Sequence, residues 1–431
     1  MLILHTSDWH LGRSFHGTGM LQSQREVLDQ MVATVRERGV DLVLVAGDVY
    51  DRALPAADAV ELLDAALADL VSAGARVVLT SGNHDSAIRL GFGGHLMGAA
   101  GVHVRTRMDG LNLPVVLPDP EGGTVAVYGI PYLEPRHAGQ VWDVEPNHPA
   151  VTAEAVRRIR EDAAERFGAQ GDALGEPDEG PGGGTAAGTA AATAAGADTA
   201  IIVMAHLFAA GGAGSDSERD IGAERPAETE AGEPLVGTLG QVPATVFEGV
   251  DYAALGHLHG RQRLAETVRY SGSPLPYSFS EADHTKGGWL VRTASGRVTD
   301  VEPVDFSSGR RLAVLRGRIQ DLLEGAEYAW AEDRWCQITV TDQVRPPQAY
   351  RRLKERYEGL LNFILDPEGV TATAPSTYAA RLAAATTDLQ VCTGFVEHVR
   401  QRPATASEAE LLDTALDESR SRTEQGEGSA A

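Results

Sequence analysis

Five short polar clusters hold the residues of this chain that could do chemistry, and each stands at or just behind an apolar run. In chain order they are an Asp-x-His pair, a Gly-Asp pair, an Asn-His-Asp triplet, a lone histidine and a His-x-His pair. Their candidate residues are Asp8, His10, Asp48, Asn83, His84, Asp85, His206, His257 and His259. Carboxylate oxygens suit Mn²⁺ or Mg²⁺, and neutral imidazole suits Mn, Fe or Zn. A mixed set without cysteine therefore predicts two divalent cations, with Mn²⁺ favoured and Mg²⁺ as the alternative.

Each cluster taken alone also has an ordinary structural interpretation. An Asp-x-His pair is often a solvated turn, and a Gly-Asp pair is often a helix cap. His206 could be a hydrogen-bonded core histidine, His84 could brace its own turn, and Asp85 could cap the following helix. The His-x-His pair is stronger, because side chains two residues apart on an extended segment point the same way. Only the five clusters together favour a metal site.

The segments around these clusters follow the rhythm of a layered α/β domain. The runs "LILHT", "DLVLVAG", "ARVVLTSG" and "TVAVYGIPY" predict strands, and the apolar period predicts helices over residues 21–38 and 56–73. In such folds the C-terminal ends of parallel strands meet at one edge of a sheet. Clusters far apart in the sequence are therefore expected to converge there.

Changes in composition and in the pattern of apolar residues divide the chain into three expected parts. These are a catalytic domain over 1–306, a small α/β capping domain over 307–375, and C-terminal helices with an acidic tail over 376–431, with helices near 382–398 and 407–419. A Gly/Ala-rich stretch over 168–199 is expected to be a disordered insertion, and residues 211–234 an acidic loop. A further helix is expected over 152–167.

The acidic character of the chain is unevenly distributed. The 431 residues carry a formal charge of −24, of which residues 168–235 contribute −10 and residues 404–431 contribute −5. The remainder is only mildly acidic, so net charge does not exclude a nucleic-acid ligand. Lys286 and Lys354 are the only lysines, and neither lies in a phosphate-binding loop of the G-x-x-x-x-G-K-[ST] type.

Cysteine usage and apolar run lengths bear on the compartment. Only Cys336 and Cys392 occur, which predicts a reducing environment and no disulfide framework. The first residues lack a basic leader pattern, and no window approaches the roughly 18 apolar residues of a membrane span. A cytoplasmic protein without a membrane partner is expected.

The runs "DWHLG", "AGDVYD", "GNHDS" and "LGHLH" resemble the signature of the calcineurin-like metallophosphoesterases. A narrower resemblance is to the SbcD family, the nuclease subunits of bacterial SbcCD exonucleases. It rests on "SDWHLGRSF", "AGDVYDRALPAADA", "TSGNHDSAIRL" and "RYSGSPLPYSFSEADHTKGGWLV", and covers roughly residues 1–310. It implies a layered β-sandwich flanked by helices, then a small α/β capping domain and C-terminal helices.

The resemblance also implies which residues would hold the two cations. One cation would be bound by Asp8, His10, Asp48 and His259, and the other by Asp48, Asn83, His206 and His257, with Asp48 bridging the pair. Two such cations can clamp the attacking and leaving oxygens of an in-line displacement. His84 would stabilise the phosphate or protonate the leaving oxygen, and Asp85 could fix the tautomer of His84.

The function implied is a metal-dependent DNA nuclease subunit that acts in DNA repair, recombination and replication. It would be a 3′–5′ exonuclease on duplex ends and an endonuclease on single strands and hairpins, with an SbcC-type coiled-coil ATPase that supplies the ATP chemistry and docks on the C-terminal helices. Four residues beside the motifs could contact DNA, or could be ordinary surface groups: Arg13, His16, Arg52 and Arg89.

A homodimer within a heterotetramer is the expected assembly. The apolar face of helix 21–38 could pack on a second copy, or on the chain's own sheet: Val27, Leu28, Met31, Val32 and Val35. Two other functions stay open at this point. One is a phosphoesterase for small phosphodiesters such as cyclic nucleotides, and the other is a catalytically silent scaffold.

Overall fold

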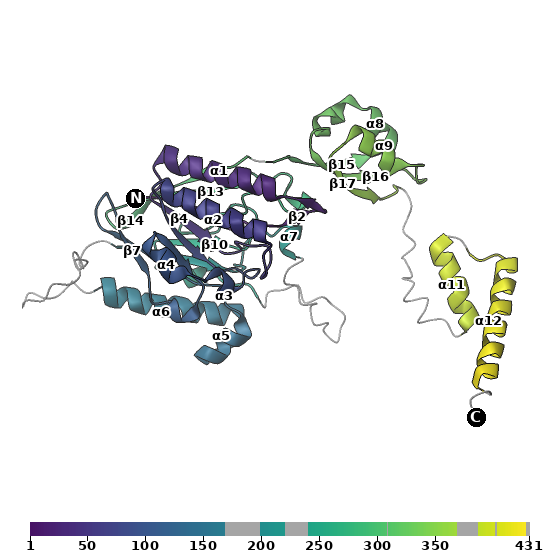
Figure 1. Cartoon of the computed structure of the whole chain (residues 1–431), viewed down its shortest axis with the longest axis horizontal. Helices are drawn as coiled ribbons and strands as arrows, with labels where there is room; N and C mark the ends of the chain where they lie inside the picture. Colours follow the sequence, from purple (N-terminus) through teal and green to yellow (C-terminus); the bar gives the residue numbers. More distant parts are fainter. Residues whose placement is uncertain (169–198, 220–239, 308, 369–386, 401–402, 428–431) are drawn as a thin grey trace, which may run out of the picture. The chain divides into compact units, whose positions relative to one another are not determined.

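The computed structural model describes residues 1–168, 199–219, 240–307, 309–368, 387–400 and 403–427 (Figure 1). The chain splits into two compact units. The first comprises Met1–Val340 and Pro346–Leu365, and the second comprises Thr341–Arg345 and Asp366–Ala431. The predicted insertion over 168–199 lies almost wholly outside the described residues, as does the part of the predicted acidic loop beyond residue 219.

Two six-stranded sheets form the centre of the first unit. The first has the order β14-β13-β1-β4-β5-β6, with β1 (Leu2–Thr6), β4 (Leu42–Ala46), β5 (Arg76–Thr80), β6 (Val102–Arg105), β13 (Gly287–Ala294) and β14 (Arg297–Asp305). The strands β1, β4, β5 and β6 run parallel, and β13 pairs antiparallel with both β1 and β14.

The second sheet has the order β11-β12-β10-β9-β8-β7. Its strands are β7 (Val115–Pro118), β8 (Thr124–Gly129), β9 (Thr199–His206), β10 (Tyr252–Gly256), β11 (Gln262–Arg263) and β12 (Val268–Tyr270). The central strands β8, β9, β10 and β12 run parallel, and the two edge strands are antiparallel. Each sheet therefore has a parallel centre whose strands end at the same edge.

Helices cover the outer faces of the two sheets. They include α1 (Leu21–Arg38), α2 (Ala57–Ser72), α3 (Ala87–Leu90), α4 (Gly94–Ala99), α5 (Pro135–Trp142) and α6 (His148–Phe167), with short turns η1 (Met108–Gly110), α7 (Asp216–Arg219), η2 (Ala244–Phe247) and η3 (Phe279–Glu281). The hairpin β2 (Ser14–Phe15) and β3 (Thr18–Gly19) follows β1.

Successive side chains along each strand face opposite sides of its sheet, so the two sheets and their helices enclose three hydrophobic cores. In β1, Leu4 packs with α1 and α2, whereas Ile3 packs between the two sheets. In β9, Val203 packs on the α6 side and Met204 faces the first sheet. Both strands are buried on both faces, as in other parallel sheets sandwiched between layers. The result is the helix–sheet–sheet–helix layering of a mixed α/β protein, which confirms the predicted fold class.

A third, three-stranded parallel sheet follows in the same unit. It contains β15 (Leu312–Gly317), α8 (Ile319–Glu324), η4 (Ala326–Ala331), β16 (Trp335–Val340), α9 (Ala349–Arg356) and β17 (Leu360–Leu365). It has its own core around Leu322, Ile338 and Leu353. This sheet lies where the capping domain is predicted.

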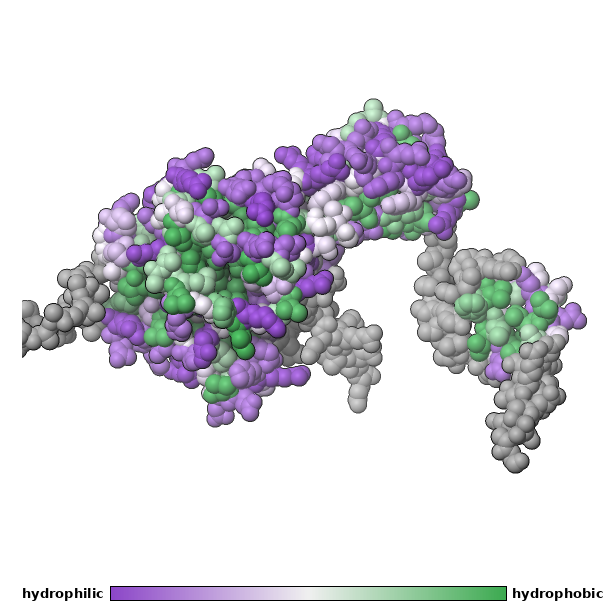
Figure 2. Space-filling view, in the orientation of Figure 1, coloured by the Kyte–Doolittle hydropathy of each residue, from purple (hydrophilic) through white to green (hydrophobic). Residues whose placement is uncertain are grey.

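The described helices of the second unit are α11 (Asp388–Arg400) and α12 (Ala406–Glu427). The two helices contact each other. Their residue ranges are close to those of the two helices predicted from the sequence. Figure 2 shows apolar residues on the surface of this pair. Leu411 of α12 is 72% exposed. Among the described helices, none has the length and apolar character that crossing a membrane requires.

The apolar face of α1 packs on the chain's own sheet. Val27, Leu28, Met31, Val32 and Val35 are all buried in the core shared with β1, β4 and α2. Of the two interpretations of this face, the ordinary one holds, and a second copy would need another surface. Among the large apolar side chains that the first unit exposes are Ile88 on α3, Leu96 on α4 and Phe92 between them.

One buried histidine links the two sheets and is expected to make stability depend on pH. His5 lies between Tyr252 Oη at 3.0 Å and Leu255 O at 3.2 Å, and burial lowers its pKa to about 3. In the unfolded chain His5 is protonated below about pH 6.5, whereas in the folded chain it stays neutral down to about pH 3. The contribution of neutral His5 to stability is therefore complete above pH 6.5 and is lost as pH falls toward 3. As pH falls below 6.5, the free energy of unfolding should decrease more steeply in the wild type than in His5→Gln, by roughly 1.4 kcal/mol for each pH unit. Urea unfolding of both metal-free proteins at neutral and mildly acid pH checks this, and parallel losses would contradict it.

Candidate metal centre

The predicted ligand residues lie at the C-terminal ends of five parallel strands from both sheets. Asp8 and His10 follow β1, Asp48 follows β4, and Asn83 follows β5. In the second sheet, His206 is the last residue of β9, and His257 and His259 follow β10. The strand ends of the two sheets face each other at this edge, so residues up to 251 positions apart in sequence come together.

One half of the cluster joins Asp8, His10 and His259. Their ligand atoms all lie within 4.8 Å of one another, and all three residues are buried. The Nε2 atoms of His10 and His259 are 3.2 Å apart. Two nitrogens bound at about 2.1 Å to one cation, at angles between 90° and tetrahedral, lie roughly 3.0–3.4 Å apart. The separation of these two imidazoles thus fits a shared cation.

The other half of the cluster centres on the amide oxygen of Asn83. This oxygen lies 3.0 Å from His206 Nε2 and 3.2 Å from His257 Nδ1. His206 Nε2 also lies 3.3 Å from Asp48 Oδ2, and the same Asp48 oxygen is 3.6 Å from His10 Nε2. Asp48 therefore stands between the two halves, where the bridging residue is predicted.

The backbone is strained at several of these positions. Asp8, His10, Asp48 and His257 all have positive φ, at 54°, 44°, 49° and 105°. Residues other than glycine rarely adopt this conformation, and they keep it only where the surroundings enforce it. Four of the eight positive-φ residues outside glycine in the described chain are thus candidate ligands, which marks this edge as a functional site.

Gly82 serves close packing rather than a special backbone turn. A glycine between a strand and a polar loop suggests a sharp left-handed turn, but the φ of Gly82 is not in the left-handed region. A Cβ at Gly82 would collide with the Asp48 carboxylate, and one at Gly256 would collide with Ala46 O. These glycines let the Asp48 loop approach its neighbours, because they carry no side chain.

The buried charges of the cluster compensate one another. Burial opposes the charge of Asp48, but the neighbouring imidazoles of His206, His10 and His84 hold the pKa of this carboxyl well below its usual range. Burial also lowers the pKa of His206, yet Asp48 outweighs it and raises that pKa to about 9. Burial keeps His257 neutral, with a pKa of about 3. Without metal, a protonated His206 thus balances the charge of the Asp48 carboxylate. Bound divalent cations would replace that proton as the balancing positive charge.

A sequence model of the calcineurin-like phosphoesterases matches residues 1–261, a span that includes all seven predicted ligands. The chain belongs to this family. Two solved structures are similar over most of the chain. TT1561 of Thermus thermophilus shares 13% identity at a TM-score of 0.37, covering 70% of this chain and 98% of its own. GAP50, the anchor in the inner membrane complex of Plasmodium, shares 10% at 0.32, covering 72% and 89%. These TM-scores lie below 0.5, so the assignment rests on the family match alone.

The chain is therefore a metal-dependent phosphoesterase, and His84 is a polar group beside the cluster whose hydrogen bonds are incomplete. His84 Nδ1 lies 2.7 Å from Asp51 O, to which it must donate because a carbonyl only accepts. Its Nε2 is buried, lacks a hydrogen-bond partner, and lies 3.9 Å from Asp48 Oδ2. This nitrogen faces the cluster and can form a hydrogen bond with a bound ligand, because no group of the protein does so.

The predicted role of Asp85 is wrong in this phosphoesterase. Its carboxylate does not reach His84, whose tautomer is fixed by Asp51 O, and the cap of α3 is the Ser86 side chain. Asp85 instead accepts hydrogen bonds from the backbone N–H groups of Val49, Tyr50 and Gly82, at 2.9–3.0 Å. It ties the loop after β4 to the loop after β5 and so positions Asp48 and His84 indirectly.

The four predicted DNA contacts differ in how accessible they are. Arg13 is mostly buried, 3.7 Å from Asp51 and over the ring of Tyr277. His16 and Arg52 are exposed, and Arg89 is exposed while donating to Ala53 O. Arg13 thus belongs to the support of the centre, and the other three remain available to a ligand.

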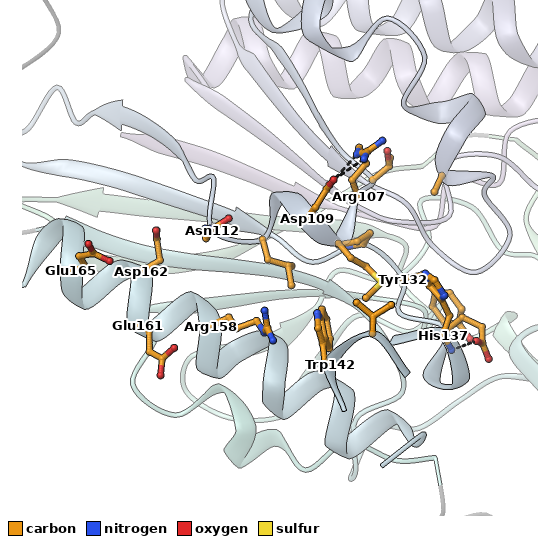
Figure 3. Close-up of a pocket in the computed structure, with 17 residues that line it drawn as sticks. Arg107, Asp109, Asn112, Tyr132, His137, Trp142, Arg158, Glu161, Asp162 and Glu165 are labelled. Atoms are coloured by element: carbon orange, nitrogen blue, oxygen red, sulfur yellow. Dashed lines mark hydrogen bonds and ion pairs between the residues drawn. The ribbon is translucent and has the colours of Figure 1, made fainter. Parts of the chain in front are cut away.

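A groove of about 910 Å³ borders the phosphoesterase centre at Tyr132, whose ring lies 6.5 Å from that of His206. Figure 3 shows it running between the Arg107–Asp109 segment and the helices α5 and α6, past Trp142 and Arg158. None of the predicted site residues lines it. Its walls carry five carboxylates against two arginines, which disfavours a phosphate backbone there. The centre is the buried cluster and not this groove.

Sequence reasoning missed several buried or half-buried polar residues that contact the ligand residues or His84. They are Asp51, Ser217, Glu218, Tyr277, Glu281 and Lys286. Ser217 and Glu218 lie at the start of the predicted acidic loop, in its described part, and Glu281 and Lys286 lie in the run "SFSEADHTK". Their polarity alone gave no signal, because contacts across the fold decide what they do.

Proposed function

We propose that this chain is the nuclease subunit of an SbcCD-type complex and hydrolyses DNA phosphodiesters with two divalent cations, Mn²⁺ in preference to Mg²⁺. The observation that carries the proposal is the convergence of seven oxygen and nitrogen donors around one edge, with the buried and unpartnered Nε2 of His84 beside them. In this proposal Asp8, His10, Asp48 and His259 hold one cation. Asp48, Asn83, His206 and His257 hold the other.

The side chains of the site would divide the work of phosphodiester hydrolysis among them. Bound divalent cations supply Lewis-acid charge for an in-line displacement at phosphorus. His84 donates through Nδ1 to Asp51 O, so its Nε2 either accepts a proton or, as imidazolium, donates one toward a phosphate oxygen. The burial of most of the cluster would limit the access of bulk water to bound cations, which would strengthen each of these interactions.

DNA is favoured over a small phosphodiester by two features. The SbcD-like runs include "RYSGSPLPYSFSEADHTKGGWLV", which contributes buried residues around the centre. The small sheet β15–β17 also contacts the centre's surroundings, because Trp335 stacks on Phe15 with ring centroids 5.6 Å apart. Phe15 lies in the hairpin directly after the Asp8–His10 loop. A small-molecule esterase has no evident need for such an added sheet.

The proposed partners are an SbcC-type ATPase and a second copy of the chain. The helices α11 and α12 form a unit with exposed apolar side chains, Phe395 at 52% and Leu411 at 72%, which suits docking to a coiled-coil partner. The residues of the catalytic centre contain no phosphate-binding loop, so ATP would be bound by that partner. The homodimer stays a prediction, and its surface is not the buried face of α1.

Assays on the purified full chain test the proposed function. We expect the chain to hydrolyse a hairpin-capped duplex and single-stranded DNA with Mn²⁺, and to lose activity in EDTA. The parallel substrates are bis(p-nitrophenyl) phosphate and a cyclic nucleotide, and metal content is measured by mass spectrometry.

The outcomes separate the three functions that the sequence left open. Turnover of the small substrates with no cleavage of DNA would overturn the nuclease in favour of a small-molecule phosphoesterase. A chain that binds no cation and cleaves nothing would be a scaffold on this fold. Two cations per chain with Mn²⁺-dependent DNA cleavage supports the proposal.

A further inference from the structure

A buried network of three side chains surrounds His259, and we name Ser217, Glu281 and Lys286 the His259 frame. Glu281 lies in η3, and its side chain is fully buried. Its Oε1 accepts from Ser217 Oγ at 2.7 Å, and its other oxygen pairs with the Lys286 ammonium. Ser217 Oγ lies 2.8 Å from His259 Nδ1. The frame thus joins the loop at 215–218 to the segment 277–286 through one imidazole.

The chemistry of these groups favours one direction for each hydrogen bond. Glu281 is paired with an ammonium and so is a carboxylate, which only accepts. Ser217 Oγ lies 2.7 Å from both Glu281 Oε1 and Ser215 Oγ, and Glu281 Oε1 also lies 3.4 Å from His259 Nδ1. A carboxylate this close to Nδ1 favours a proton on that nitrogen, which the Ser217 oxygen accepts when Ser217 donates to Glu281. The proton of His259 is held on Nδ1, and the lone pair on Nε2 faces His10. This is the tautomer a cation needs at Nε2.

The backbone of His259 is held by the same surroundings. Lys286 Nζ donates to His259 O at 2.9 Å and to Ser273 Oγ at 3.0 Å, and the His259 N–H donates to Glu218. The ring, the carbonyl and the amide of this one residue are thus each tied down. Lys286 also places a positive charge where the buried Glu281 would otherwise be uncompensated, which burial alone makes costly.

The other imidazoles of the cluster are held differently. His206 Nδ1 lies 2.9 Å from Ala46 O, and His84 Nδ1 lies 2.7 Å from Asp51 O. Both acceptors are backbone carbonyls, so no side-chain substitution removes them. Side chains also surround His10, whose Nδ1 lies 3.8 Å from Asp51 Oδ1 and whose ring packs against Tyr277. The His259 frame consists of side chains that are not themselves predicted ligands, two of which lie within hydrogen-bond distance of a ring nitrogen of His259. It reaches only the half of the centre that contains Asp8, His10 and His259.

We propose that Ser217, Glu281 and Lys286 are positioning residues that set the orientation and tautomer of His259, and so control the affinity of one of the two cation positions and not the other. This inference rests on the proposed two-cation site. It makes the start of the loop at 211–219 part of the catalytic apparatus rather than a surface elaboration. The two positions are then expected to differ in how they depend on the rest of the chain.

Metal binding to the full-length, metal-free chain tests the inference directly. In Ser217→Ala, which removes one oxygen and leaves the Glu281–Lys286 pair intact, one Mn²⁺ should bind about 10- to 100-fold more weakly while the other keeps its affinity. Calorimetric titration with Mn²⁺ measures both affinities. Electron paramagnetic resonance at one equivalent per site distinguishes a spin-coupled pair from an isolated ion, and the variant should show the isolated ion.

Further variants keep the test decisive. Glu281→Gln with Lys286→Met removes both buried charges together and should reproduce the selective loss, because the serine then has no carboxylate to orient it. Exposed Ser72→Ala on α2 should match the wild type. Thermal unfolding without metal shows that each variant is folded, and His259→Ala gives the reference for full loss of that position.

Two results would overturn the inference, and they are separable from failure of the proposed function. Unchanged binding of both ions in folded Ser217→Ala would show that the frame does not position His259. Equal weakening of both ions would show that it supports the fold in general. A wild-type chain that binds no pair of Mn²⁺ ions would instead remove the proposed two-cation site itself.

Discussion

Asp48→Asn is expected to abolish metal binding at both positions and to lower the hydrolytic rate by about three orders of magnitude or more, which is roughly 4 kcal/mol of transition-state stabilisation. Asp48 Oδ2 lies 3.3 Å from His206 Nε2 and 3.6 Å from His10 Nε2, so the same oxygen faces both halves of the centre. Without this anion, two adjacent dications would repel each other with nothing between them. Metal content by mass spectrometry and the rate on DNA measure the two effects.

Asparagine is the suitable replacement because of the local backbone. Asp48 has φ 49°, a conformation that asparagine tolerates well, so the variant should keep its loop. Its Oδ1 also accepts from the His84 N–H at 2.9 Å, and the amide oxygen of asparagine can do the same. Asp69→Asn on the exposed face of α2 is the matched control. Two tightly bound ions in folded Asp48→Asn would contradict the bridging role.

The sequence predicted the strand ends well because each ligand cluster follows an unbroken apolar run. "LILHT", "DLVLVAG" and "ARVVLTSG" became β1, β4 and β5, and the residues just beyond them meet at one edge. Parallel strands buried on both faces leave little freedom over where they end. The helix expected over 152–167 begins earlier, at His148, because the Asn147 side chain caps it by accepting from the Ala150 N–H.

What the sequence could not predict was decided by contacts between distant segments. Asp85 lies next to His84 in the chain, yet the His84 tautomer is fixed by Asp51 O, 33 positions away. Ser217 and Glu281 occur in polar stretches without any period, so nothing local relates them to His259. The spacing of motifs in the sequence identifies residues at strand ends. It does not identify residues of distant loops that contact them only in the folded chain.

His84→Ala is expected to leave both cations bound while lowering the rate on DNA by roughly 10²- to 10⁴-fold. His84 contacts Asp48 mainly through its backbone N–H, which alanine keeps, and its imidazole Nε2 is 3.9 Å from Asp48 Oδ2. His84 Nε2 is near enough to His10 and Asp48 to share a cation with them, so the metal content of His84→Ala decides between a role toward the substrate, as proposed, and a role as a ligand. Steady-state rates on DNA and metal content, with exposed His95→Ala on α4 as the control, measure this separation.

The choice of substrate then separates the two roles of His84. A deoxyribose alkoxide must be protonated as it leaves, whereas p-nitrophenolate is stable without a proton. If His84 protonates the leaving oxygen, His84→Ala should lose far more activity on DNA than on bis(p-nitrophenyl) phosphate. If it stabilises charge on the phosphate, the two losses should be similar, because both substrates develop that charge. Full activity of His84→Ala on DNA would remove the residue from the mechanism, since its orphaned Nε2 would then have no catalytic partner.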